Sequence, residues 1–227
     1  METFKPKLLE FSNQQKTEGS TIISEEIPLA EEFYRAQPDF VLAALGVKKR
    51  YLPWRLSDFQ EIGSIPDILQ GLFITGGPGT GKTSLASALF RDFLPYTIVP
   101  EHIDPRFKCD GAFSAIFIRV PWLFREIRAA SQEKGARGET TCIERYGRIR
   151  LAVFDDFGME KQSEWTVSTF ADILEEREGE MLPTIVTSNL TVKEIWQVEP
   201  RVASRLAGMR ILKLEGPDRR LGRCSSS

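Results

Sequence analysis

The chain has 227 residues, of which 41% are apolar and 27% are charged, and its formal net charge is −2. This length suits one sizeable α/β domain with a short appendage, and the near-neutral charge gives no global sign of nucleic-acid binding. No apolar run approaches the ~18 residues that cross a bilayer, and the first ten residues are polar, so we expect neither a membrane span nor a secretory signal, and a cytoplasmic location.

The N-terminal part of the chain is expected to form an arm and a helix. Residues 1–30 are polar and contain a glycine and a proline, which favours a flexible arm with at most a short helix. Residues 31–47 have apolar side chains at spacings of three and four, the pattern of an amphipathic helix. We therefore divide the chain into an arm and helix at 1–50, which is the expected partner-binding region, a nucleotide domain at 51–220 and a flexible tail at 221–227.

A phosphate-binding loop is the most informative stretch of the chain. Residues 76–83 read Gly-Gly-Pro-Gly-Thr-Gly-Lys-Thr, in which the first glycine is followed after four residues by Gly-Lys-Thr. An apolar run at 71–75 precedes the loop and a helix-like run follows it, which favours a nucleotide site over a plain glycine-rich turn. The predicted nucleotide-binding residues are Gly76, Gly77, Pro78, Gly79, Thr80, Gly81, Lys82, Thr83 and Ser84.

Each residue type in this loop has a physical task. Glycines let the backbone curl so that successive N–H groups point at phosphate oxygens, and the positive N-terminal end of the following helix faces the same anion. The Lys82 ammonium adds a point charge near the β- and γ-phosphates, and the Thr83 hydroxyl is a ligand for Mg²⁺. The loop therefore predicts a nucleoside triphosphate, interpreted as ATP, together with Mg²⁺.

Five short apolar runs alternate with helical stretches and predict the fold. Near-continuous apolar strands separated by helices are the pattern of a parallel sheet covered on both faces. Between the third and fourth runs, Val167, Phe170, Ala171 and Leu174 repeat at helical spacing and are expected to face the core. The five runs are residues 71–75, 115–120, 151–154, 183–188 and 211–214.

An irregular segment interrupts this alternation at residues 95–110. It contains three prolines and is expected to be an extended loop without chemistry. His102 and Cys109 fall within it, but two candidate ligands do not make a tetrahedral zinc site.

Adjacent carboxylates, Asp155 and Asp156, follow the third apolar run. Ligands bind at the carboxyl ends of strands in open α/β sheets, so both acids are expected close to the phosphates. Asp155 is expected to hold Mg²⁺ through its hydration shell, and Asp156, which points the other way, is expected to orient or deprotonate the attacking water. Two solvated acids at the start of a loop are the structural alternative, which the phosphate loop earlier in the chain makes less favoured.

The fourth apolar run ends in Thr-Ser-Asn at 187–189. If its strand lies between the strands that precede the loop and the acids, Asn189 sits beside the γ-phosphate and can fix the water by hydrogen bonding. A strand-ending Asn that caps a turn is the alternative.

Two arginines, Arg201 and Arg205, are four residues apart on a predicted short helix at 200–206, so they share a face. An arginine that enters a phosphoryl-transfer site from outside spreads positive charge over the transferring group, an effect worth ~10³–10⁵ in rate. Spacing alone assigns neither arginine to this task, and a surface salt bridge is the alternative.

Taken together, these motifs resemble one group of ATPases. The phosphate loop, Asp-Asp-Phe-Gly at 155–158, Leu-Pro-Thr-Ile-Val-Thr-Ser-Asn at 182–189 and Arg-Val-Ala-Ser-Arg-Leu at 201–206 are similar to the DnaC/IstB group of AAA+ ATPases. That group includes bacterial and phage replicative-helicase loaders and the ATPase subunits of some transposition systems. The resemblance runs from about residue 46 to 220. It implies an α/β P-loop NTPase of the AAA+ (ASCE) type, a three-layer sandwich with a five-stranded parallel sheet and no C-terminal lid domain.

The resemblance also implies roles for individual residues. The loop residues and the two acids keep the tasks given above, and Asn189 becomes the first sensor of the γ-phosphate. Arg205 becomes the arginine finger that reaches the ATP of a neighbouring subunit, which makes a homo-oligomer part of catalysis. Without the helical lid domain of larger AAA+ proteins the resemblance does not supply a second sensor, and Arg219 or Arg220 is the candidate substitute.

Local charge adds a candidate DNA interface. Residues 119–150 hold eight basic and four acidic side chains, a local basic excess that the rest of the chain lacks. In related initiators and loaders the helix after the second strand lines the face that meets single-stranded DNA, and here that helix is predicted at 121–134. A stripe of Arg125, Arg128 and Lys134 would contact phosphates and make binding salt-dependent, whereas an ordinary solvated helix face is the alternative.

The favoured interpretation is an ATP-hydrolysing homo-oligomer that binds single-stranded DNA and a replicative helicase, as a helicase loader. A transposition-helper ATPase that acts on double-stranded DNA with a transposase has the same motor motifs and is the nearest alternative. A small-molecule kinase is less favoured because the sequence shows no candidate acceptor site or lid. A non-hydrolysing nucleotide-binding adaptor is the remaining alternative.

Overall fold

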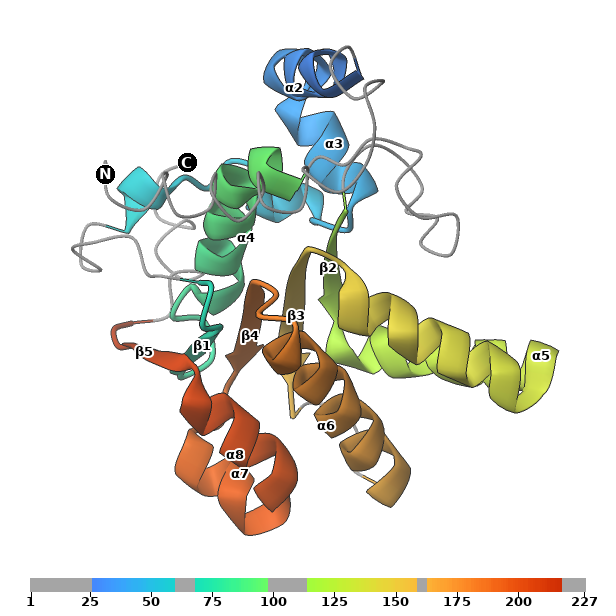
Figure 1. The fold of residues 1–227 in the computed structure, drawn as a ribbon. Coiled ribbons are helices and arrows are strands. Elements are labelled where there is room, and N and C mark those ends of the chain that lie inside the picture. Colours follow the sequence, from blue (N-terminus) through green and yellow to red (C-terminus); the bar gives the residue numbers. More distant parts are fainter. Residues whose placement is uncertain (1–25, 60–67, 98–113, 159–162, 218–227) are drawn as a thin grey trace.

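The core of the protein is a parallel β-sheet, as a computed structural model shows for residues 26–59, 68–97, 114–158 and 163–217. Its strands lie in the order β2-β3-β4-β1-β5, and all their pairings are parallel. The predicted runs and the predicted α/β fold are confirmed (Figure 1). The strands are β1 (Leu72–Gly76), β2 (Ala115–Arg119), β3 (Leu151–Phe157), β4 (Thr184–Ser188) and β5 (Arg210–Leu214).

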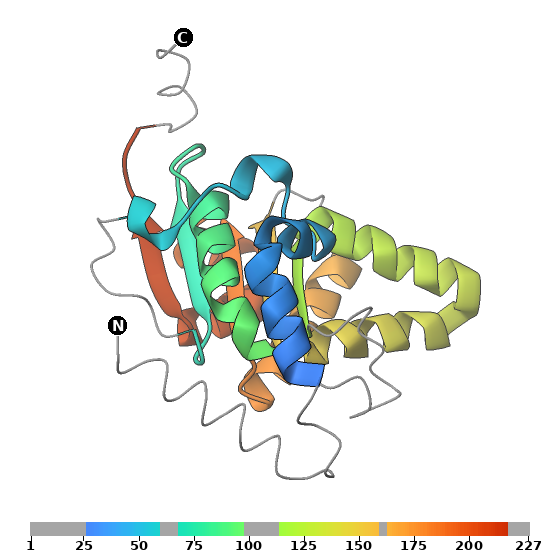
Figure 2. The ribbon, with the colours of Figure 1, turned by 90° about the horizontal axis from the view of Figure 1, so that it is seen from above.

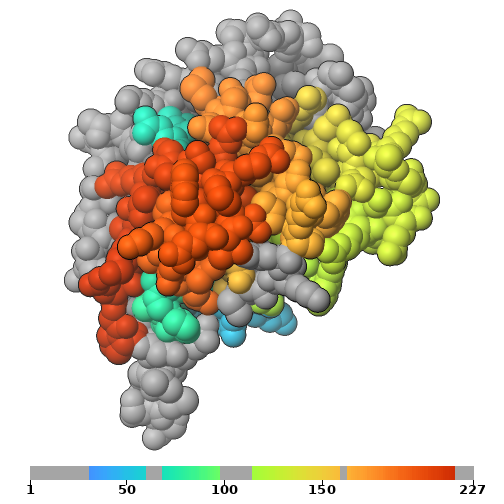
Figure 3. Space-filling view, turned by 90° about the horizontal axis from the view of Figure 1, so that it is seen from below, coloured from blue at the N-terminus to red at the C-terminus, as the bar shows by residue number. Residues whose placement is uncertain are grey.

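Helices cover both faces of this sheet. Side chains of β1 alternate between two cores, with Leu72 and Ile74 in the one under α4 and Phe73 in the other, as the period-two geometry of a strand requires. Figure 2 shows the first helical layer and Figure 3 the second, with α6, α7 and α8 covering that face. The first layer contains α2 (Glu26–Ala36), α3 (Pro38–Ala44) and α4 (Lys82–Phe93), and the second contains α5 (Val120–Arg148), α6 (Glu164–Gly179), α7 (Val192–Val198) and α8 (Pro200–Gly208).

The apolar face predicted between the third and fourth strands belongs to α6. Phe170, Ala171 and Leu174 are buried in the second core, and Val167 packs against its margin. Phe170 stacks on Phe157 of β3 with ring centroids 4.9 Å apart. The helix therefore packs directly beneath the strand that bears the two acids.

The N-terminal helix predicted at 31–47 is wrong in its extent, because the chain forms two helices there. Gln37 separates them with φ −135° and ψ 57°, which is not helical. The next residue, Pro38, has no N–H and disfavours helical geometry in the residue before it, so the first helix ends and a new one begins. The first of these helices starts at Glu26, within the stretch expected to be an arm, and the rest of that arm lies outside the described residues.

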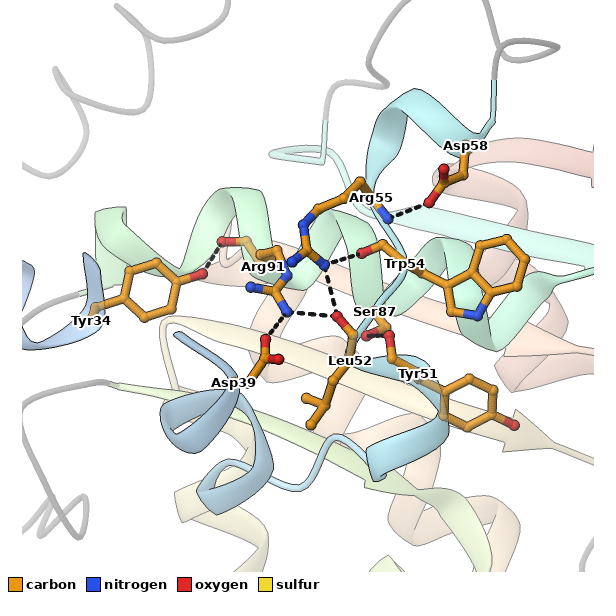
Figure 4. A network of polar contacts seen from close by, with 9 residues as sticks. All are labelled: Tyr34, Asp39, Tyr51, Leu52, Trp54, Arg55, Asp58, Ser87 and Arg91. Carbon is orange, nitrogen blue, oxygen red and sulfur yellow. Dashed lines mark hydrogen bonds and ion pairs between the residues drawn. The ribbon is translucent and has the colours of Figure 1, made fainter. Parts of the chain in front are cut away.

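Polar contacts join this N-terminal region to α4, as Figure 4 shows. The Tyr34 hydroxyl donates to the carbonyl of Arg91 at 2.8 Å, and the Arg91 guanidinium donates to the Asp39 carboxylate and to the Leu52 carbonyl. The Ser87 hydroxyl donates to the carbonyl of a residue in η1 (Lys49–Tyr51) at 3.1 Å. The described residues before 51 thus share a core with the nucleotide domain, and their partner-binding role stays a prediction.

Helix α5 is a hairpin of two arms. The helix predicted at 121–134 is confirmed as its first arm, and the chain then turns at Gly135, whose φ of 63° and ψ of −156° interrupt the helix. Gly138 lies so close to the first arm that a Cβ there would meet the Ala130 carbonyl oxygen at 2.2 Å. Figure 2 shows the two arms side by side and projecting past the edge of the sheet.

Buried Arg177 of α6 fixes the end of this hairpin against the sheet. Its guanidinium donates to the carbonyls of Tyr146 and Ile149 at 2.9 and 2.6 Å, and to the carbonyl of Pro183 and the hydroxyl of Thr184 at 2.8 Å each. The side chain is 1% exposed, and burial lowers its pKa to about 9. One cation therefore holds together the end of α5, the end of α6 and the start of β4.

Two further sequence predictions fall largely outside the described residues. Only the beginning of the segment predicted as a loop at 95–110 is described, and it belongs to η4 (Leu94–Thr97), a 3₁₀ helix. Arg219, Arg220 and the tail at 221–227 lie beyond the described residues. Within the part that the structure describes, no helix combines the length and the apolar character needed to span a membrane.

Candidate nucleotide-binding site

The phosphate loop joins the end of β1 to the start of α4, at the carboxyl edge of the sheet, where the strands end. Gly76, Gly79 and Gly81 have φ of 149°, 79° and 102°, a region that side chains with a Cβ rarely adopt. A Cβ on Gly76 would also lie 2.2 Å from the Leu214 carbonyl oxygen of β5. Glycine is thus required here both by backbone conformation and by the close approach of a neighbouring strand.

Lys82, the first residue of α4, lies inside the curve of this loop. Its ammonium donates to the carbonyl oxygens of Gly76 and Gly77, both at 2.7 Å, and the side chain is 6% exposed. A buried cation enclosed by loop carbonyls, at the N-terminal end of a 12-residue helix, marks a place prepared for an anion. The residues present therefore fit a bound triphosphate.

Asp155 is the buried acid of the site, with 2% of its surface exposed. Its Oδ1 accepts hydrogen bonds from the Thr83 hydroxyl at 2.9 Å and from the Thr187 hydroxyl at 2.7 Å. Burial raises the pKa of this carboxyl to about 6, neighbouring Asp156 adds to the rise, and the two hydroxyls oppose it. A carboxylate that is poorly solvated and lies beside a threonine hydroxyl suits a hard divalent cation such as Mg²⁺.

Asp156 points to the other side, as predicted. Its carboxylate accepts from Nε of Arg119, at the end of β2, at 3.1 Å, and its N–H donates to the Thr187 hydroxyl at 3.0 Å. The residue has φ of 60°, and the pairing of β3 with β4 shifts register at this point. Such a conformation costs a non-glycine residue about 1–3 kcal/mol and is found mainly at functional sites.

Asn189 follows the last residue of β4. Its predicted place beside the γ-phosphate requires β4 to lie between β1 and β3, and the strand order has it there. The turn after β4 is fixed on both sides. The Thr75 hydroxyl of β1 donates to the Leu190 carbonyl, and the Ser188 hydroxyl donates to the Phe157 carbonyl of β3, both at 2.8 Å. The sensor role of Asn189 stays a prediction.

Thr187 was not assigned a role from the sequence, although it contacts both acids. The Thr-Ser-Asn motif at 187–189 predicts a task for its asparagine alone. A threonine inside an apolar strand, two residues before the asparagine, was the available signal. Its hydroxyl both donates to Asp155 and accepts from the backbone of Asp156, so it fixes the two acids relative to each other.

The metal site would depend on few protein ligands. The described residues contain no group of three or more histidine, cysteine, aspartate or glutamate side chains that could hold a metal ion. A cation beside Asp155 and Thr83 would therefore complete its shell with phosphate oxygens and water, which is usual for Mg²⁺.

The arginines predicted on one helix face lie at the amino edge of the sheet, where the strands start. Their helix, α8, ends just before β5, whose first residue Arg210 pairs with Leu72 at the start of β1. Arg205 forms ion pairs with Glu175 at 2.8 Å and Glu178 at 3.0 Å, both on α6. Arg201 pairs in the same way with Asp172 at 3.2 Å. Within one chain the salt-bridge alternative is therefore realised, and the finger role of Arg205 stays a prediction.

The predicted DNA-binding side chains Arg125, Arg128 and Lys134 are exposed on α5, but they do not form one stripe. Lys134 follows Arg125 by nine residues, which is two and a half helical turns, so the two point to opposite sides. The guanidinium of Arg125 lies 4.9 Å from the ring centre of Trp122, and that of Arg128 lies 4.7 Å from the ring centre of Trp165. The prediction of a single stripe is therefore wrong. DNA contact by these residues individually stays a prediction.

The chain is similar in sequence to one curated protein and in fold to several solved structures. The chain is 32% identical over 127 residues to the putative insertion sequence ATP-binding protein y4pL of Sinorhizobium fredii, a match that covers 56% of this chain and 44% of that protein. The chain therefore spans less than half the length of this curated relative. No protein-family model matches the chain.

Solved structures share the fold. DnaI is 21% identical with a TM-score of 0.54, over 78% of this chain and 98% of that one, and the DnaC helicase loader is 21% identical with a TM-score of 0.53, over 74% and 100%. The replication initiator DnaA bound to AMPPCP and single-stranded DNA is 18% identical with a TM-score of 0.56, over 76% and 52%. The predicted resemblance is confirmed: the structures of similar fold include DnaI, the DnaC helicase loader and DnaA, and the curated relative is an insertion-sequence ATP-binding protein.

Proposed function

We propose that this protein is an ATP-hydrolysing, DNA-associated oligomer that acts as a helicase loader. One observation supports the ATPase part above all others. The Asp155 carboxylate accepts hydrogen bonds from Thr83 of the phosphate loop and from Thr187 of β4, so three segments meet at one point. The loader part is supported by the fold shared with DnaI and the DnaC helicase loader.

The chain's own residues divide the work at this point. Bound Mg²⁺–ATP would supply an electrophilic γ-phosphorus whose charge the metal partly neutralises. Lys82 would hold the phosphates from inside the loop, and Thr83 with Asp155 would hold the metal. Asp156 would orient or deprotonate the attacking water after leaving Arg119, while Asn189 would contact the same water from the end of β4.

Arg205 is proposed to act on the nucleotide of another subunit. Its helix lies at the amino edge, whereas the phosphate loop lies at the carboxyl edge, four residues of strand β1 away, or about 13 Å. Its present partners, Glu175 and Glu178, are more than half exposed, and such surface pairs contribute only about 0.2–1 kcal/mol. The guanidinium could thus leave them for a phosphate at small cost.

The transposition-helper alternative rests on a separate observation, namely the curated relative, whose name describes an insertion-sequence ATP-binding protein. The motor residues are the same under both proposals, so the partner distinguishes them. A pull-down with the full chain as bait would recover a replicative helicase under the first proposal and a transposase under the second. Filaments on double-stranded DNA would also favour the second.

Mixing two inactive variants tests the ATPase proposal and the finger together. Lys82→Ala removes nucleotide binding but keeps the finger, and Arg205→Ala keeps nucleotide binding but loses the finger, with hydrolysis reduced ~10³-fold or more. An equimolar mixture should regain DNA-stimulated phosphate release, because each subunit supplies what its neighbour lacks. The control Arg201→Ala, one helical turn away, should hydrolyse ATP normally. An Arg205→Ala protein with unchanged turnover would remove the finger from the proposal.

A further inference from the structure

A hollow of about 410 Å³ lies beside β2, at one side of the sheet. β2 is an edge strand, with β3 on one flank, and on the other its Phe117 N–H donates to the Leu45 carbonyl at 2.8 Å. The walls come from β2, from both ends of the α5 hairpin and from the segment after α3. Two strands separate this place from β1 and its phosphate loop.

The lining combines an indole with positive charge. Trp122 lines the hollow and is 51% exposed, so part of its ring is open to a ligand. The cations Lys48, Arg119 and Arg145 line it as well, against a single carboxylate, Glu126, which accepts a hydrogen bond from the Tyr146 hydroxyl. Lys48 and Arg145 are exposed and form no ion pair with any carboxylate that the structure describes.

These side chains come from three separate parts of the sequence. Lys48 follows α3, Trp122 belongs to the first turn of α5, and Arg145 belongs to its last turn. The fold of the hairpin brings Arg145 back beside Trp122, and the contact of Leu45 with β2 brings Lys48 to the same place. Neither Arg128 nor Lys134 lines the hollow, so the site differs from the stripe predicted on α5.

Aromatic rings framed by cations are how proteins hold unpaired nucleic-acid strands. A base stacks on the ring, and the cations meet the phosphates on either side of it. The bases of a duplex are covered by their neighbours and cannot present a face to an indole, so a single strand is the ligand that uses both features. An acidic peptide would satisfy the cations but would gain little from the ring.

We propose that this hollow binds one unstacked base of single-stranded DNA on Trp122, with Lys48 and Arg145 contacting the adjoining phosphates. The proposal rests on the proposed function, since it adds a strand-binding site to a DNA-associated ATPase. Arg125, whose guanidinium lies over the Trp122 ring, adds positive charge next to the base.

The test measures the affinity of the full chain, with Mg²⁺ and ATP, for a fluorescent oligothymidylate. Trp122→Ala should weaken binding about 10-fold, because stacking of one base is lost, and Trp122→Phe should restore most of the affinity. Trp196→Ala is the matched control and should bind like the wild type, because Trp196 is also 51% exposed but lies on α7 and does not line the hollow.

A second pair of variants keeps the test decisive if Trp122→Ala does not fold. Lys48→Ala and Arg145→Ala change exposed positions, and each should make the negative slope of log affinity against log salt shallower by about 0.7. Unchanged slopes in both would overturn the proposal, as would equal affinity of the wild type and Trp122→Ala. Competition by a duplex as strong as that by the single strand would also overturn it.

Failure of this site and failure of the proposed function give different results. If the wild type binds the oligonucleotide and Trp122→Ala binds it equally, the hollow is not the site, while the DNA-associated ATPase stands. If the wild type binds a fluorescent ATP analogue but no DNA of either form, the DNA part of the proposed function fails, and this site fails with it.

Discussion

The two edges of the sheet hold their charged side chains in opposite ways. At the carboxyl edge, Asp155 is 2% exposed and receives hydrogen bonds from two threonine hydroxyls of its own chain. At the amino edge, the side chain of Arg205 is 35% exposed and pairs with two glutamates that are more exposed than itself. The first group is bound tightly within one chain, and the second only loosely.

This difference indicates which functions one chain can complete alone. A buried carboxylate needs its partners in place before any ligand arrives, because an unsatisfied buried charge is expensive. An exposed ion pair contributes little to stability and can exchange one partner for another. The carboxyl edge therefore has the properties of a preformed site, and the amino edge those of a surface whose ion pairs can exchange partners.

Removing the second acid should have the largest effect on chemistry at the carboxyl edge. We expect Asp156→Asn to lower ATP turnover about 10²–10⁴-fold, because an amide cannot accept a proton from water. Binding of a fluorescent ATP analogue should persist. Phosphate release is the measurement, and Asp172→Asn at the amino edge is the control, which should keep full turnover. Normal turnover by Asp156→Asn would mean that another group activates the water.

Buried Arg177 is an exception at the amino edge. Unlike Arg205, it is held by buried hydrogen bonds, as Asp155 is at the carboxyl edge. Arg177→Met should lower the free energy of unfolding by about 3 kcal/mol or more, since three buried carbonyls lose their donor. Urea denaturation measures this change. Arg148→Met removes an exposed pair with Glu176 and should cost less than about 1 kcal/mol. Equal losses in the two variants would contradict the role given to burial.

The raised pKa of Asp155 makes the stability contribution of the carboxyl edge depend on pH. In the protein free of metal and nucleotide, the folded carboxyl has a pKa of about 6 against its usual 3.8. The folded state therefore binds a proton that the unfolded state releases between these values, so the contribution of this carboxyl to stability is fully present below pH 4 and is lost as the pH rises through 6. The full loss for this group is about 3 kcal/mol, since each pKa unit is worth about 1.4 kcal/mol.

Thermal unfolding of Asp155→Asn measures that contribution. The variant should lack this fall and be more stable than the wild type above pH 6, although its Mg²⁺-dependent ATP hydrolysis is lost. Adding Mg²⁺ and ATP should stabilise the wild type and not the variant. A wild-type curve that rises between pH 4 and 6 relative to that of the variant would show that the carboxyl is stabilised in its charged form instead.

The smallest effect is expected at the exposed arginines. Arg201→Ala and Arg205→Ala should each change the free energy of unfolding by less than about 1 kcal/mol, because their ion pairs are open to solvent. Urea denaturation at low protein concentration avoids any contribution from assembly. A loss of several kcal/mol on replacing Arg205 would place it among the structural arginines, beside Arg177.

Much of the carboxyl edge could be predicted because its residues follow local rules. Glycine spacing, a lysine at a helix start and acids at a strand end have meanings that hold wherever the strands are placed. Thr187 escaped prediction because its role depends on strand order: its hydroxyl reaches both acids only since β4 pairs with β3. The break at Gln37 was missed although the following proline was the signal, and the α5 hairpin was predicted only to its turn.

By itself, the sequence determined the five strands, the phosphate loop and the pair of acids, because each is specified by side chains that are close together along the chain. The tertiary structure alone decided that Thr83, Asp155 and Thr187 share one hydrogen-bonded point, and that Arg205 lies at the opposite edge. It also assembled Trp122, Lys48 and Arg145 around one hollow. These meetings depend on strand order and on the return of a helical hairpin, and no local pattern of residues encodes either.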